Sequence, residues 1–208
     1  MHLEKLGLLT PHLIADHCVV LDDTDIQVLA ENRVNVLHCI ESNMKLASGL
    51  APVQALIDRG VNVCMGTDGS ASNNDVDMFG EMSSVAKVHK GFHLDPTIVS
   101  AETTVKMATI NGARALGLSE RIGSLEAGKE ADMVALDLGQ LNTQPLYNPI
   151  SQIVYAAGRE QVSDVWVAGQ QLLKERRLTT LDDHEIMHRA RLWQERIGAA
   201  NRTGHAGP

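Results

Sequence analysis

A short apolar run that ends in one carboxylate between two glycines constrains this chain most. The run is Val61-Asn62-Val63-Cys64-Met65, and Gly66-Thr67-Asp68-Gly69 follows it. The pattern predicts a buried strand from Val61 to Thr67 that places Asp68 at its carboxyl end. In an α/β barrel the carboxyl ends of the strands carry the chemistry, so Asp68 is a candidate metal ligand or proton carrier. The alternative is a turn or helix-capping aspartate, because Thr-Asp-Gly is also favourable turn chemistry.

Two similar apolar runs come earlier in the chain, Leu13 to Val20 and Val34 to His38, and both are predicted strands. Helical patterns follow the runs: one begins at Asp22, one spans 52–59, and one spans 78–89. Asp95-Pro96 then fits the N-cap and first position of a helix, and the helical pattern continues through Val105 and Leu116 to end near Gly117. Strands that alternate with helices form parallel βα units. Residues 1–120 are therefore predicted to be an α/β region.

The pattern changes after residue 120. A turn-rich link over 122–129 precedes a predicted strand over 132–137 and a predicted hairpin over 162–173. Asp182-Asp183 then caps a predicted helix that runs to about Ala200. We expect a small all-β unit over 121–181, a terminal helix over 182–200 and a frayed tail over 201–208.

Composition excludes several kinds of partner. With 18 basic and 26 acidic residues the net charge is −8, which disfavours a nucleic-acid or anionic-membrane surface. No run has the length of a transmembrane helix, and the first residues do not resemble a signal peptide. The three cysteines, Cys18, Cys39 and Cys64, lie in or beside apolar runs without CxxC spacing. We therefore expect reduced thiols, no thiolate metal site, and a cytoplasmic location.

Three polar residues fall at the ends of the predicted strands: His17, His38 and Asp68. Their separations suit successive βα units, which place strand ends side by side on one rim. A histidine and an aspartate that converge there can bind a metal, orient a water molecule and move its proton. The alternative for His17 is a hydrogen-bonded core histidine, and for His38 we favour that alternative.

A second pattern competes for the metal. His184-Glu185-Ile186-Met187-His188 matches HExxH, the zinc-binding helix of many metalloproteases. Such a site needs a third ligand beyond the helix and a cleft, and the remaining residues, 189–208, end in a Gly-rich tail. Because Ile186, Met187, Ala190 and Trp193 lie on or near one face, we interpret the segment as an amphipathic terminal helix without a metal.

Longer motifs carry a resemblance to a known family. They are Ala15-Asp16-His17-Cys18, then residues 38–49 (HCIESNMKLASG), then Gly66-Thr67-Asp68-Gly69 with Ser72-Asn73-Asn74-Asp75 and Asp77-Met78-Phe79, and finally residues 122–132 (IGSLEAGKEAD). Together they resemble the amidohydrolase superfamily, in the branch of the methylthioadenosine/S-adenosylhomocysteine deaminases and triazine chlorohydrolases. The resemblance extends from about Leu6 to the last helix.

The resemblance implies a metal-dependent hydrolase that deaminates an adenosine-type purine, a small-molecule substrate. One divalent ion, Zn²⁺, would hold a water molecule whose pKa falls toward about 7. By resemblance, Asp68 is a metal ligand, takes the proton of that water and contacts the substrate, while His17 polarises the water. Ser42 and Asn43, on the loop after the second predicted strand, are candidate substrate contacts, although turn chemistry explains them as well.

The chain also departs from the family. It contains no HxH pair, and the His-x-x-Glu of the family's fifth strand is absent. A closed (β/α)₈ barrel takes about 250 residues. We therefore expect an incomplete barrel, equivalent to strands six to eight, followed by part of a small β-sandwich and a helix. One carboxylate and one histidine are too few for tight Zn²⁺ binding, so the isolated chain is expected to be inactive.

Several interpretations stay open at this stage. The chain is part of such an enzyme, or it is a non-catalytic remnant or assembly module. In the first case the N-terminal half is missing because the sequence is truncated, because the gene is split, or because a partner chain supplies that half. A related triazine chlorohydrolase, or a guanine- or cytosine-type deaminase, is a further alternative. Because the predicted strands at both sheet edges are apolar and lack a neighbour, we expect self-association or a partner that supplies the missing βα units.

Overall fold

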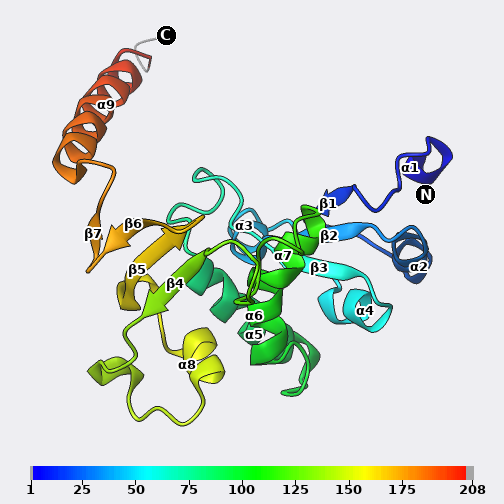
Figure 1. Cartoon of the computed structure of the whole chain (residues 1–208). Coiled ribbons are helices and arrows are strands. Elements are labelled where there is room, and N and C mark those ends of the chain that lie inside the picture. Colours follow the sequence, from blue (N-terminus) through cyan, green and yellow to red (C-terminus); the bar gives the residue numbers. More distant parts are fainter. Residues whose placement is uncertain (1, 205–208) are drawn as a thin grey trace.

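The computed structural model describes residues 2–204, and its first half is built on a small parallel sheet. The strands are β1 (Ile14–Asp16), β2 (Asn35–His38) and β3 (Asn62–Met65), side by side in chain order (Figure 1). Val36 lies opposite Ala15 on one side and Val63 on the other. The prediction of parallel βα units is confirmed.

Helices cover this sheet and bury an aliphatic core. They are α2 (Asp23–Glu31), α3 (Ile40–Lys45), α4 (Val53–Asp58), α5 (Met78–His93), α6 (Ala101–Ala108) and α7 (Ile110–Ala115), after a short α1 (His2–Lys5). The core residues lie on the strands and on the helix faces turned toward them, and they include Ile26, Leu29, Val34, Val36, Leu56, Val63, Val85 and Met107. A sheet that buries both faces needs such near-continuous apolar strands, which is why the sequence signals them clearly.

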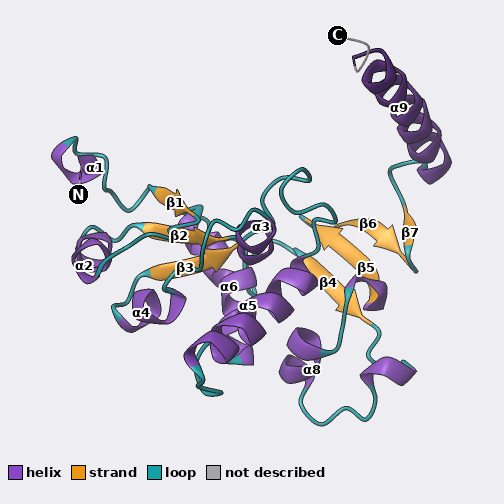
Figure 2. Cartoon of the chain, turned by 180° about the vertical axis from the view of Figure 1, so that it is seen from behind, coloured by secondary structure: helices purple, strands orange, loops and turns teal. Residues whose placement is uncertain are grey.

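The second half forms an antiparallel sheet. Its strands are β4 (Met133–Leu136), β5 (Val162–Val167), β6 (Gln170–Lys174) and β7 (Arg177–Leu178), again in chain order. The helix α8 (Pro149–Tyr155) packs against α5 and α6 and so joins the two halves, with η1 (Leu141–Thr143) and η2 (Arg159–Gln161) flanking it (Figure 2). The chain is thus a mixed α/β structure with one parallel and one antiparallel sheet. The predicted hairpin is confirmed, with Val167 opposite Gln170.

The last helix, α9 (Asp183–Gly204), projects away from the body (Figures 1 and 2). The frayed tail expected over 201–208 is therefore wrong as far as residue 204, and residues 205–208 lie outside the described part. No helix among the described residues has both the length and the apolar character needed to span a membrane.

Two strands are shorter than predicted because the backbone turns at their carboxyl ends. The first ends at Asp16 instead of Val20, since His17 and Cys18 adopt positive φ values of 61° and 47°. The third ends at Met65 instead of Thr67, and Asp68 also has a φ of 61°. A strand cannot continue through residues in this left-handed region.

Several helices also differ from their predictions. Asp95-Pro96 does not start a helix: the Asp95 carboxylate accepts a hydrogen bond from Thr97 N at 2.8 Å in a turn, and α6 begins after Ser100. The single predicted helix is two helices, because Thr109 breaks it with φ −131° and ψ −98°. The helix predicted to end at His89 continues to His93, while α3 and α8 were not predicted at all.

The outer edge of β3 is less open than expected. The Asn111 side-chain amide of α7 donates to Val63 O at 2.8 Å, and Asn62 Nδ2 donates back to Asn111 O at 3.0 Å. These bonds occupy part of the strand edge that a neighbouring strand would otherwise pair with.

Candidate functional site

Three strand ends bring the predicted site residues together. His17 follows β1, Ser42 and Asn43 lie on α3 just after β2, and Asp68 follows β3. His17 and Asp68 both have φ near 61°, in a region that residues other than glycine rarely adopt. Such strain costs about 1–3 kcal/mol per residue and concentrates at functional sites. The backbone thus turns both side chains out of the sheet at the same rim.

Asp68 is held as an ionised carboxylate. Its Oδ2 accepts hydrogen bonds from Ser42 Oγ and Ser72 Oγ, both at 2.7 Å, and its Oδ1 accepts from Gly69 N at 2.6 Å. The hydroxyl hydrogen bonds, more than any nearby charge, lower the pKa of Asp68 to about 2. Oδ1 keeps a lone pair for a further ligand, since a carboxylate offers about four acceptor positions.

His17 is oriented by Asn43. Its Nδ1 lies 2.7 Å from Asn43 Oδ1, which is an acceptor, so Nδ1 donates this hydrogen bond and Nε2 is the nitrogen that faces the carboxylates. Nε2 lies 3.8 Å from Asp68 Oδ2 and 3.7 Å from Asp16 Oδ2. These separations are too long for direct hydrogen bonds and suit a cation or a water molecule between the atoms. The other amide atom, Asn43 Nδ2, is buried and has no acceptor among the described residues.

The donor set fits zinc in kind but not in number. One atom each from Asp16, His17 and Cys39 lie within 4.8 Å of one another, next to Asp68. Burial raises the pKa of Cys39 to about 12, and its Sγ donates to Asp16 Oδ1 at 3.5 Å. It is therefore a neutral thiol rather than a thiolate ligand. The Asp16 carboxylate and the His17 imidazole remain of this group, and Asp68 lies outside it. Zinc sites use at least three protein ligands, so the group is one ligand short.

Comparison with known proteins places this chain in a family. A sequence profile described as the Amidohydrolase family matches residues 1–172. The chain belongs to the amidohydrolase family. It is 53% identical over 190 residues to a 5-methylthioadenosine/S-adenosylhomocysteine deaminase of Syntrophobacter fumaroxidans, covering 91% of this chain and 43% of that protein. A protein of the same name from Teredinibacter turnerae is 49% identical over 200 residues, with 95% and 45% covered.

Solved structures agree with this assignment. An adenosine deaminase from Xanthomonas campestris with bound zinc matches with a TM-score of 0.93 and 49% identity, covering 95% of this chain and 45% of that one. An atrazine chlorohydrolase from Arthrobacter aurescens, in complex with zinc, matches with a TM-score of 0.84 and 29% identity, covering 90% and 42%. The amidohydrolase chain thus spans less than half the length of these relatives.

Other residues that support the site were missed by the sequence analysis. Ser72 donates to Asp68, and its neighbour Asn73 donates through Nδ2 to Glu81 Oε1 at 2.9 Å and to Glu41 Oε2 at 3.4 Å. Burial raises the pKa of Glu81 to about 7, and the Glu41 charge adds to this shift. The carboxylate pair ties the loop after Asp68 to α3 and α5. Ser72 and Asn73 stand in a quoted motif, but nothing in the sequence indicates which carboxylates they meet.

His38 does not join the site. It is fully buried, and its Nε2 lies 3.2 Å from Nε2 of His89 on α5. Burial lowers the pKa of His38 to about 3 and that of His89 to about 4, so both rings are neutral at physiological pH. His38 is therefore a core histidine, in line with the interpretation favoured from the sequence.

The HExxH residues lie on the exposed helix α9, remote from the strand ends. His184, Glu185 and His188 are exposed, and Glu185 accepts a hydrogen bond from Arg189 Nε at 2.7 Å. Within residues 2–204, the one group of three metal-binding side chains is at the strand ends instead. The structure thus gives α9 no third ligand among the described residues.

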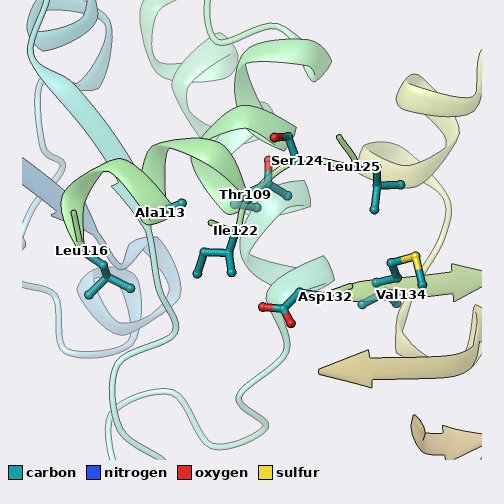
Figure 3. A pocket seen from close by; sticks show the side chains of 12 residues that line it. Thr109, Ala113, Leu116, Ile122, Ser124, Leu125, Asp132 and Val134 are labelled. Carbon is teal, nitrogen blue, oxygen red and sulfur yellow. The ribbon is translucent and has the colours of Figure 1, made fainter. Parts of the chain in front are cut away.

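A separate cavity of about 530 Å³ lies between α7 and β4 (Figure 3). Mostly apolar side chains line it, among them Ala113, Leu116, Ile122, Leu125 and Val134. Its one carboxylate, Asp132, accepts a hydrogen bond from Ala168 N at 2.6 Å. None of the strand-end residues reaches this cavity, so it is apart from the candidate site.

Proposed function

We propose that this chain supplies His17 and Asp68 to the active site of a zinc-dependent hydrolytic deaminase. The substrate we propose is an adenosine-type purine, methylthioadenosine or S-adenosylhomocysteine. The observation that carries the proposal is the pairing of His17 Nε2 with the ionised Asp68 carboxylate, 3.8 Å apart at neighbouring strand ends. Relatives about half identical to the chain bear the name of such a deaminase.

We further propose that the parallel sheet is the strand-six-to-eight part of an incomplete (β/α)₈ barrel. Residues 1–120 would form this part, 121–181 a portion of a β-sandwich, and the terminal helix would follow from residue 182. The remaining barrel strands, with the other metal ligands, would come from the part of the full-length protein that this chain lacks. The relatives' greater length supports this proposal. The three free thiols favour a reducing compartment, so we place the protein in the cytoplasm.

Each site residue then has a chemical role. A bound Zn²⁺ lowers the pKa of a coordinated water toward about 7 and so supplies hydroxide at neutral pH. Asp68 would be a ligand through the free lone pair of Oδ1, and Ser42 and Ser72 fix its orientation. His17 accepts or returns a proton at Nε2, because Asn43 holds the proton of the other nitrogen.

Two residues remain candidates for contact with the substrate. Asn43 Nδ2 is a buried donor without an acceptor among the described residues. It would donate to a ring nitrogen or a hydroxyl of the purine nucleoside only after the side chain turns toward the strand ends. Ser42 Oγ already donates to Asp68 but keeps its lone pairs for a substrate donor.

Other functions are weaker candidates. The likeness to atrazine chlorohydrolase keeps dechlorination of a triazine as an alternative, but the identity of 29% is lower than for the deaminases. A guanine- or cytosine-type deaminase would use the same pair of residues. A non-catalytic remnant or assembly module is the alternative favoured by the short ligand set of the isolated chain.

Co-expression tests the proposed function. The 208-residue chain is produced with the portion of the Syntrophobacter relative that it does not match, and zinc content and ammonia release from methylthioadenosine are measured. We expect one zinc per assembly and turnover that Asp68→Asn abolishes. An assembly that binds zinc and releases chloride from a chlorotriazine, but no ammonia from the nucleoside, would support the triazine alternative.

A further inference from the structure

The helix α9 carries an apolar stripe with coiled-coil spacing. Ile186, Ala190, Trp193 and Ile197 follow one another at intervals of four, three and four residues. This spacing places them on one narrow face of a helix, the pattern of a seam that packs against another helix. We call these four residues the α9 seam.

The seam is exposed in this chain. Trp193 is 60% exposed, Ile197 57% and Ile186 44%, and every side chain over 183–197 is exposed. Figures 1 and 2 show the helix pointing away from both sheets, joined to the body through β7. Exposing four apolar residues along one face of a helix to water is unfavourable. We therefore expect a partner to cover them.

The helix α9 lies in the same place, at least in part, in a longer protein of known structure. The adenosine deaminase of Xanthomonas campestris matches 95% of this chain with a TM-score of 0.93, and the unmatched twentieth is shorter than α9. At least part of α9 therefore projects in the same direction in a protein more than twice as long. A helix that keeps this direction without packing on the body is held by something outside these 208 residues.

Charge beside the seam disfavours a second copy as that partner. Arg189 and Arg196 lie along the same flank of the seam, and the Arg196 guanidinium lies 5.3 Å from the centre of the Trp193 ring. In an antiparallel pair of identical helices these arginines would face the arginines of the other copy, and in a parallel pair Arg189 would face the uncharged Gln194. Neither arrangement forms an ion pair across the seam.

We propose that the α9 seam packs against the part of the full-length amidohydrolase that this chain lacks, as an intramolecular or inter-chain helix contact with acidic residues opposite Arg189 and Arg196. The inference rests on the proposed completion of the barrel by a second part. It does not depend on the reaction or on the metal, so the activity proposal and this one can fail separately.

Tryptophan fluorescence reads the seam directly, because the chain has two tryptophans and Trp166→Phe leaves only Trp193. The Trp166→Phe chain is co-expressed with the unmatched portion of the Syntrophobacter relative. We expect the two to co-purify with Trp193 emission shifted to the blue relative to the chain alone. Trp193→Ala and Ile197→Glu should each weaken the association roughly 30-fold or more, as for a buried anchor residue.

Leu192→Glu is the matched control. Leu192 is 41% exposed on the same helix but lies off the seam, so this change should leave the affinity within about threefold. Where the portion does not fold separately, the same variants are compared in one polypeptide that joins it to this chain, with thermal unfolding as the readout. Equal effects of Ile197→Glu and Leu192→Glu would overturn the proposal. A blue shift of the chain alone that grows with its concentration would identify a second copy as the partner and also overturn it.

Discussion

The side chains at the strand ends of the parallel sheet are fixed by hydrogen bonds, whereas the apolar side chains of the helix α9 are exposed to solvent. At the strand ends, Asp68 accepts three hydrogen bonds and His17 is fixed by Asn43, all from within the chain. On α9 the apolar side chains over 186–197 lie in solvent. The difference shows that hydrogen bonds within the chain already orient His17 and Asp68. The helix α9 is formed, but its apolar side chains over 186–197 have no packing partner outside the helix among the described residues. Substitutions in the two regions should therefore differ in what they affect.

The largest effects are expected at Asp68 and His17, in the co-expressed assembly. His17→Ala should lower kcat by roughly 10²–10⁴, the usual cost of losing a general acid–base group, while zinc stays bound. Asp68→Asn should lose both zinc and turnover, since it removes a ligand and a proton acceptor together. Zinc analysis beside steady-state kinetics separates the two. Loss of zinc in His17→Ala would make His17 a ligand instead.

The next effect concerns stability and compares two leucines on helices. Leu56 on α4 is fully buried, whereas Leu192 on α9 is 41% exposed. Leu56→Ala should lower the free energy of unfolding by about 2–5 kcal/mol, because it leaves a cavity in the core. Leu192→Ala should change it by less than about 0.5 kcal/mol. Urea unfolding of the isolated chain measures both, and similar losses would mean that α9 packs on the body in solution.

The sequence predicted the parts of this structure that depend on local patterns. The apolar runs around Ala15, Val36 and Val63 predicted the three parallel strands. The ends of the first and third runs pointed to His17 and Asp68 as candidate site residues. The features that the sequence did not predict depend on backbone conformation and on contacts between distant parts of the chain. The first strand ends early because His17 and Cys18 turn to positive φ, and the Asn73–Glu81 contact joins residues whose meeting is set by the packing of α5. Likewise, periodicity predicted α9 but not that its seam stays uncovered.

The carboxylates of Glu41 and Glu81, which support the loop after Asp68, should make the stability of the chain depend on pH. Burial raises the pKa of Glu81 from its ordinary value of 4.5 to about 7, so the folded state binds this proton more tightly than the unfolded chain. Its contribution to stability is therefore complete below pH 4.5 and declines as the pH rises to about 7, by about 3 kcal/mol at most. Chemical unfolding at a series of pH values measures the slope.

Two variants test this assignment. Glu81→Gln keeps an acceptor for Asn73 and cannot ionise, so the decline between pH 4.5 and 7 should disappear. Glu41→Gln removes the neighbouring charge that also raises the pKa of Glu81, so the decline should end at a lower pH and be smaller. An unchanged slope in Glu81→Gln would assign the pH dependence to another group.

The smallest effect is expected from the HExxH residues of α9. His184 and His188 are exposed on a helix away from the rim, and Glu185 pairs with Arg189. Replacing both histidines with alanine should leave zinc content and turnover of the co-expressed assembly unchanged, since neither reaches the strand ends. It should also leave the association intact, because the two residues lie outside the α9 seam. Loss of one zinc from this double variant would show that the helix holds a metal in the assembly, and α9 would then have a chemical role beyond packing.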